Sequence, residues 1–103
     1  MSERIIKKGK ANLWKQYEAS GGTLLLTEKE LTHRPHGVNI QSNVVSIGLK
    51  EIEQVELSVN KLLFIRIPNG VTVTLRNGEI FKFVVFGRRK WKEEIEHAIK
   101  QFV

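Results

Sequence analysis

The sequence predicts a mainly β fold, a partly open barrel of about seven antiparallel strands capped by one C-terminal α-helix. Three observations predict it. Apolar and polar residues alternate with a period of two along most of the chain, the pattern of strands with one buried face. Turn-forming residues separate these segments at short intervals. After Gly87 the apolar residues change to helical spacing.

The strands are expected, in chain order, at 11–18, 23–27, 30–35, 45–49, 54–59, 71–76 and 79–86. Four turn signals separate neighbouring strands: Gly21-Gly22, Glu28-Lys29, Pro68-Asn69-Gly70 and Asn77-Gly78. Asn77-Gly78 is the strongest of them, because a type I′ hairpin turn needs positive φ at both central residues. The pattern therefore predicts an antiparallel meander.

The strand at 79–86 is apolar on both faces. Phe81 and Phe83 share the face expected to point inward, while Ile80, Val84 and Phe86 form the opposite one. A strand with two apolar faces is typical of one that is covered on both sides. We therefore expect all five side chains to be buried.

The last 15 or so residues predict an amphipathic helix. Trp91, Ile95, Ala98, Ile99 and Phe102 fall on one stripe at helical spacing. Charged residues occupy the other side. The stripe has to be buried, and a helix that plugs one open end of a curled sheet buries it.

Composition limits the functions that the chain can have. Its 103 residues include 17 Lys and Arg against 11 Asp and Glu, a net charge of +6, and no cysteine. Disulfides, thiol chemistry and cysteine zinc sites are excluded. We expect a basic, mobile segment at 1–10 and a single domain at 11–103. The N-terminus lacks the apolar stretch of a signal peptide, so a location in the cytoplasm or at the surface of its membrane is expected.

Several segments of the chain carry a family resemblance. In order they are Glu18 to Thr27, Leu31, His36 to Gln41, Ile67 to Gly70, and Phe83 to Arg88 with Trp91. In this order they resemble a GRAM domain, a branch of the pleckstrin-homology-like (PH-like) superfamily, in its short stand-alone bacterial form. The resemblance runs from about Ala11 to Ile99. It implies a partly open seven-stranded barrel with a capping helix, and a binding or scaffolding role, often at membranes, without catalysis.

The chain departs from the superfamily at one place. PH domains that bind phosphoinositides place basic residues on the first two strands, around their connecting loop. Here Lys15 lies on the first strand, but 18–27 contains no Lys or Arg, and Glu18 would repel phosphates. The resemblance therefore does not predict a phosphoinositide pocket at that loop.

Two basic clusters are candidate contacts for an anionic partner or a membrane. Arg88, Arg89 and Lys90 begin the helix, where cations oppose the helix dipole but free backbone N–H groups attract anions. Lys7, Lys8 and Lys10, preceded by Arg4, form the second cluster. The alternative for both is a solvated, solubilising surface.

Other candidate sites are weaker. Leu63 and Phe64 belong to the most apolar segment, 62–67, which is either core or an exposed hydrophobic contact. His33 and His36 are three apart and point to opposite faces of a strand, so no metal site is expected. No nucleophile, P-loop or dinucleotide motif occurs. We therefore expect no enzyme and no cofactor.

These observations predict a non-catalytic binding module with a protein partner or an anionic membrane surface. One alternative is a basic β-barrel that binds nucleic acid, which the positive charge permits. However, the RNA-recognition pattern of glycines and aromatics is absent, so nucleic acid is disfavoured. Another alternative is an adaptor without a ligand of its own. An open barrel keeps an edge strand that can pair with a second copy of the chain.

Overall fold

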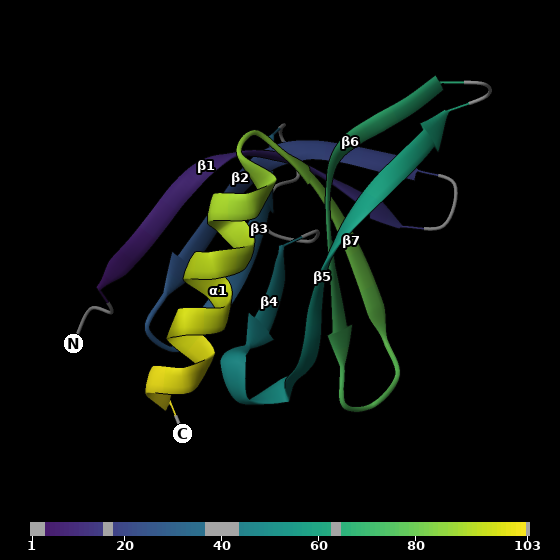
Figure 1. Ribbon diagram of the computed structural model, residues 1–103. Coiled ribbons are helices and arrows are strands. Elements are labelled where there is room, and N and C mark those ends of the chain that lie inside the picture. The colour runs from purple at the N-terminus through teal and green to yellow at the C-terminus, as the bar shows by residue number, and fades with distance from the viewer. Residues whose placement is uncertain (1–3, 16–17, 37–43, 63–64, 103) are drawn as a thin grey trace.

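The structure is a computed structural model that describes residues 4–15, 18–36, 44–62 and 65–102. Within these ranges, seven strands and a short 3-10 helix precede one α-helix, and Figure 1 shows their arrangement. The elements are β1 (Ile5–Lys15), β2 (Glu18–Thr27), β3 (Glu30–Pro35), β4 (Val45–Gly48), the short 3-10 helix η2 (Leu49–Glu51), β5 (Ile52–Leu62), β6 (Ile65–Leu75), β7 (Ile80–Val85) and α1 (Arg88–Phe102).

All seven strands form one antiparallel sheet in the order β4-β3-β2-β1-β7-β6-β5. β4 and β5 are its two ends, so the curled sheet is not closed into a barrel. α1 covers one side of the curl (Figure 1), where it packs on β5, β6 and η2. The predicted fold, a partly open barrel of seven strands with a C-terminal helix, is confirmed.

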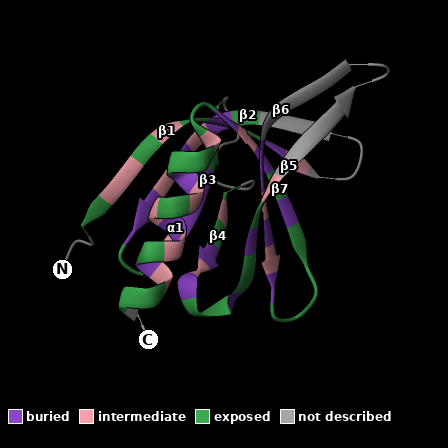
Figure 2. Ribbon diagram, in the orientation of Figure 1, coloured by how far each residue is buried: buried purple, intermediate pink, exposed green. Residues whose placement is uncertain are grey.

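The core lies between the concave side of the sheet and α1. Buried positions alternate along the strands (Figure 2), as the period-two pattern predicts. Trp91, Ile95 and Ala98 bury the helix stripe against residues such as Phe83 and Leu49. Complete burial of each large apolar side chain stabilises the fold by about 1.5–3 kcal/mol.

Gly21 and Gly22 do not form the expected turn. Both lie inside β2, where Gly22 pairs with Ala11 on one side and Pro35 on the other. A Cβ atom on Gly22 would lie 2.1 Å from the Arg34 carbonyl oxygen. The glycine is therefore explained by the close approach of β3, not by a turn.

Two further boundaries differ from the prediction. β1 begins at Ile5, so 5–10 is not a segment ahead of the first strand but is paired with β2. Pro68-Asn69-Gly70 lies inside β6 and ends no strand. β5 accommodates this stretch by a register shift between Ser58 and Asn60, the kind of irregularity at which a strand tolerates proline.

Two turn predictions are confirmed. At Glu28-Lys29, the Thr27 hydroxyl accepts hydrogen bonds from the N–H groups of Lys29 and Glu30. At Asn77-Gly78, Gly78 has φ of 97° and donates to the Leu75 carbonyl. This hairpin loop is one residue longer than a two-residue type I′ turn, because Leu75 N–H donates to the Glu79 carbonyl.

Candidate functional site

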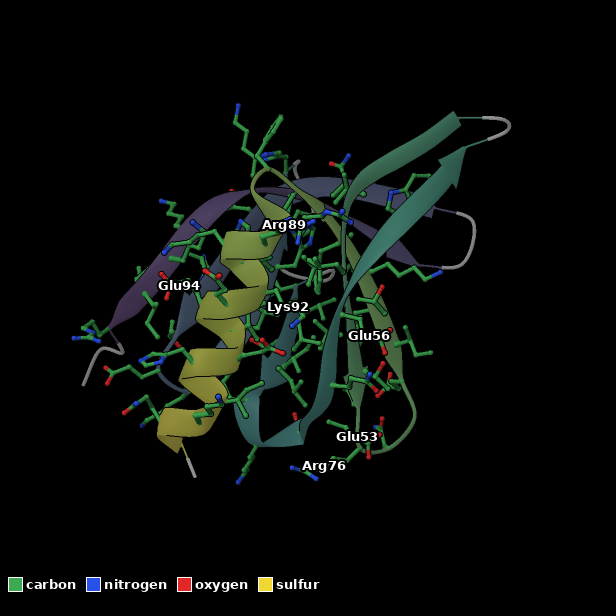
Figure 3. All side chains as sticks on the ribbon, viewed as in Figure 1. Glu53, Glu56, Arg76, Arg89, Lys92 and Glu94 are labelled. Carbon is green, nitrogen blue, oxygen red and sulfur yellow. The ribbon has the colours of Figure 1, made fainter. Side chains whose placement is uncertain are left out.

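The first turn of α1 places cations at the surface. Arg89 and Lys90 are exposed and Arg88 is half-buried. Arg89 lies next to the turn from β7 (Figure 3). Among the described residues, neither Arg89 nor Lys90 forms an ion pair. The turn thus presents two unneutralised charges at the end of the helix that already attracts anions.

An exposed aromatic side chain precedes these cations. Phe86 is 84% exposed in the turn between β7 and α1, and Ile80 at the other end of β7 is 58% exposed. The expectation that this face of the strand is covered is wrong at both ends, since Ile80 and Phe86 are exposed. The following Gly87 has φ of 68°, a left-handed conformation that favours glycine. Sequence reasoning missed Phe86 because period-two alternation cannot tell a covered outer face from a bare one.

The N-terminal cations do not act as one cluster. Lys8 and Lys10 are exposed on the outer face of β1, whereas the Lys7 ammonium lies 5.2 Å from the centre of the Trp91 ring. That cation–π contact ties β1 to α1. A Cβ atom on Gly9 would lie 3.3 Å from Trp91 Cζ2, so the indole also packs closely on the β1 backbone. Lys7 therefore has a structural contact, and only Lys8 and Lys10 face outward.

Lys10 and Phe86 lie close together where the pairing of β1 with β7 ends. Ala11 pairs with Val85, so the preceding Lys10 faces the end of β7, where Phe86 follows. Lys10, Phe86, Arg89 and Lys90 are called the cationic rim below. Glu53 and Glu56 lie along β5, away from the first turn of α1 (Figure 3).

Beside the rim, an open groove of about 410 Å³ lies on the outer face of the sheet. The residues that line it include Gly21, Lys10, Asn12, His36, Val84 and Phe86. None of its described lining residues is acidic. We call it the Gly21 groove. Sequence reasoning missed it because Gly21 and Gly22 were expected in a turn.

His33, within β3, and His36, directly after β3, occupy different environments. His33 is 1% exposed and its Nε2–H donates to the Ala11 carbonyl at 3.0 Å, while Nδ1 is buried without a partner among the described residues. Burial lowers the pKa of His33 below 6.5; the hydrogen bond to Ala11 raises it, and the charge of His36 lowers it further. His36 is exposed.

Within the described residues, no group of three or more acidic, histidine or cysteine side chains is placed to hold a metal ion. The predicted hydrophobic contact residues Leu63 and Phe64 lie outside the described part of the chain. No helix in the described ranges is long and apolar enough to cross a membrane.

This architecture is the PH-like fold, and solved structures bear it out. The C-terminal domain of an unknown protein from Leishmania infantum matches with a TM-score of 0.79 at 14% identity, over 94% of this chain and 84% of that one. The Vps36 N-terminal PH domain matches with a TM-score of 0.75 at 14% identity, over 97% and 81%.

The Slm1 PH domain, solved in complex with phosphoserine, matches with a TM-score of 0.70 at 15% identity, over 93% of this chain and 96% of that one. At these identities the likeness shows the fold alone. A scan against protein-family models found no match, and a search of curated proteins found none either. The resemblance to GRAM domains stays a prediction.

Proposed function

We propose that this PH-like domain is a non-catalytic binding module that docks peripherally on an anionic membrane surface through the cationic rim. The observation that carries the proposal is Phe86, an aromatic side chain that is 84% exposed at the tip of a turn and flanked by cations. An exposed aromatic side chain at the tip of a turn is available for insertion into a membrane interface. An apolar tip with a basic surround is the arrangement of interfacial membrane anchors.

The strength of such docking follows from the rim residues. Transfer of the Phe86 side chain out of water contributes about 1.5–3 kcal/mol. Lys10, Arg89 and Lys90 each contribute about 1 kcal/mol at an anionic surface. Together these give roughly 5 kcal/mol, which is comparable to a single myristoyl chain and therefore reversible. Glu93 and Glu94, one helical turn beyond Arg89 and Lys90, weaken the attraction and favour a tilted approach in which the turn touches first.

The helix itself is not stabilised by these cations. Arg89 and Lys90 at the N-terminal end of α1 oppose its dipole by about 0.3–1 kcal/mol each. They form no ion pair among the described residues that would offset this cost. A partner with negative charge removes the penalty, which supports a role outside the fold for these two side chains.

The comparisons support a binding role in a coarse sense. A domain of the same fold, that of Slm1, was solved with the anionic ligand phosphoserine. We extend this to the chain as a proposal of anion binding in the cytoplasm or at its membrane face, without catalysis and without a cofactor.

A protein partner is the second candidate. β4 is an end strand of the open sheet, and a groove of about 530 Å³ runs between it and the β6–β7 hairpin, past Ser46, Arg76 and Phe81. An extended peptide or a second copy of the chain can add to such an edge. This observation favours an adaptor role, independent of the cationic rim.

Vesicle co-sedimentation tests the membrane proposal. We expect the protein to bind phosphatidylcholine vesicles that contain phosphatidylserine but not vesicles of pure phosphatidylcholine. Its affinity should fall as the salt concentration rises. Phe86→Ala and the double variant Arg89→Glu/Lys90→Glu should each lose about tenfold or more in affinity. The matched control is Lys29→Glu/Lys100→Glu, which reverses two exposed charges elsewhere on the surface.

Equal binding by the Arg89→Glu/Lys90→Glu variant and its control would refute the rim as the contact. Binding to DNA or RNA with a steep salt dependence, and none to vesicles, would favour the nucleic-acid alternative. Phe81 and Phe83, at 8% and 1% exposure, are not available to stack on bases.

A further inference from the structure

We propose that the Gly21 groove binds a phosphate monoester, and that this selects which anionic surface the domain docks on. The inference rests on the proposed function, because it names the chemical group that the docked domain recognises next to its rim. The site is built from three strands and from the residue that follows β3.

The strand register places the groove side chains in two adjacent rows. Asn12 pairs with both Gly21 and Val84, and His36 N–H donates to the Gly21 carbonyl at 2.9 Å. Asn12, Gly21, His36 and Val84 therefore form one row on the outer face. In the next row Lys10 pairs with Thr23, and Phe86 follows β7 on the other side.

The hollow exists because Gly21 has no side chain. Its neighbours in the row all project outward, and a Cβ at Gly21 would meet Asn12 Oδ1 at 3.2 Å. Gly21 has no positive φ that would require glycine. The absence of a side chain is therefore explained by the space that it leaves, which at about 410 Å³ lies in the lower range of small-ligand sites.

Three hydrogen-bond donors surround this space without partners. Within the described residues, no hydrogen bond or ion pair engages the side chains of Lys10, Asn12 or His36. Exposed Arg34 adds positive charge, since it faces Thr23 and thus lies two strands, or roughly 10 Å, from Lys10. No described lining residue supplies a carboxylate.

This donor set matches a phosphate monoester. Such a group carries about −1.5 to −2 charges near neutral pH and three strong acceptor oxygens, one for each of Lys10, Asn12 and His36. The phosphodiester of an ordinary phospholipid has one charge and only two unesterified oxygens. Val84 and Phe86 give the groove an apolar wall for the carbon part of the ligand. A terminal phosphate is therefore preferred over a diester.

Two measurements test the inference with defined probes. In amide NMR, glycerol 3-phosphate should shift the signals of Asn12, Gly21 and His36, whereas the diester glycerophosphocholine should not. In co-sedimentation, vesicles with phosphatidic acid, whose headgroup is a monoester, should bind more tightly than vesicles of equal surface charge made with phosphatidylserine.

Gly21→Val fills the groove without changing any charge. We expect it to lower affinity for glycerol 3-phosphate and for phosphatidic acid vesicles by about tenfold, while binding to phosphatidylserine vesicles through the rim persists. Thr72→Val, at a half-buried position of β6, is the matched control and should change neither. Asn12→Ala removes one donor, leaves the backbone pairing intact, and should weaken the monoester alone.

The outcomes separate the two proposals. If glycerol 3-phosphate shifts none of the groove amides, or if Gly21→Val binds it as wild type does, the groove is not a phosphate site, whatever the vesicles show. If the shifts appear and vanish in Gly21→Val but no vesicle binds, the groove holds a free phosphate monoester and the membrane proposal fails. Preference for phosphatidic acid that Gly21→Val removes supports both.

Discussion

Replacing Gly22 by alanine tests how closely β3 approaches β2. The new Cβ would lie 2.1 Å from the Arg34 carbonyl oxygen and 2.8 Å from Pro35 Cα, whereas ordinary van der Waals contact begins at 3.4 Å. Both obstacles are backbone atoms of a paired strand, so no side chain can swing aside. β3 would have to move by more than about 1 Å.

The cost follows from what that movement breaks. Overpacking of a well-packed site costs about 1–3 kcal/mol, and each backbone hydrogen bond lost beside it, such as His36 N–H to the Gly21 carbonyl, costs about 1 kcal/mol. We expect Gly22→Ala to lower the free energy of unfolding by about 3 kcal/mol or more. For a domain of this size that corresponds to a fall in Tm of roughly 12–24 °C.

Thermal and urea unfolding followed by circular dichroism measure the effect, and Gly21→Ala is the matched control. A Cβ at Gly21 meets only the tip of the Asn12 side chain, at 3.2 Å, which can rotate away. The control should stay within about 0.5 kcal/mol of wild type. If the two alanine variants unfold alike, or Gly22→Ala stays within about 1 kcal/mol of wild type, the close approach of β3 is not what fixes glycine at this position.

Three further predictions concern the histidine of the core and the helix. Because burial lowers the pKa of His33, the unfolded chain binds a proton at this residue more readily than the folded protein does, so stability should fall as pH drops below 6.5. Urea unfolding at several pH values should show that the free energy of unfolding depends less on pH in His33→Gln than in wild type. Trp91→Ala should cost about 3–5 kcal/mol in unfolding experiments, but Lys7→Met, which removes only the cation–π contact, about 0.5–1 kcal/mol; equal losses would contradict this. Arg89→Glu/Lys90→Glu should raise Tm, because acidic groups suit a helix N-terminus, and a lower Tm would mean that these cations support the fold.

Period-two alternation predicted the inward face of nearly every strand because burial alternates with the pleat. Phe81, Phe83 and Val73 are buried as the pattern requires. The same rule failed on the outer face of β7 and in the turn that follows it, where Ile80 and Phe86 are exposed. Alternation reports which side chains share a face, and only the tertiary arrangement decides whether a second layer covers that face.

Glycine was the least reliable sequence signal for a turn. Gly78 marks a turn, and its φ of 97° explains why. Gly22 lies in a strand, because there the absent Cβ admits a neighbouring backbone. The two cases look alike in a sequence, since both are glycines beside polar residues between apolar runs. The distinction depends on contacts between residues far apart in the chain.

The candidate site was predictable only in part for the same reason. The cations at the start of α1 are consecutive, and the sequence predicted them as a cluster. Lys8 and Lys10 were grouped with Lys7, but alternation along β1 turns Lys7 toward Trp91 and leaves the other two outside. The Gly21 groove draws on β1, β2, β7 and the end of β3, and it appears only once the register is known.

The two neighbouring glycines of β2 therefore have separate consequences. Gly22 lies on the inner face of β2 and lets β3 come close, which places His36 in the same row as Asn12 and Gly21. Gly21 lies on the outer face, and its missing side chain leaves the hollow that Lys10, Asn12 and His36 line. If the groove is a phosphate site, Gly21→Val should lower the affinity for glycerol 3-phosphate by about tenfold in a protein of normal stability, whereas Gly22→Ala should lose stability first and binding only as the fold is lost. The pair of variants thus distinguishes a glycine retained for a ligand from one retained for the sheet.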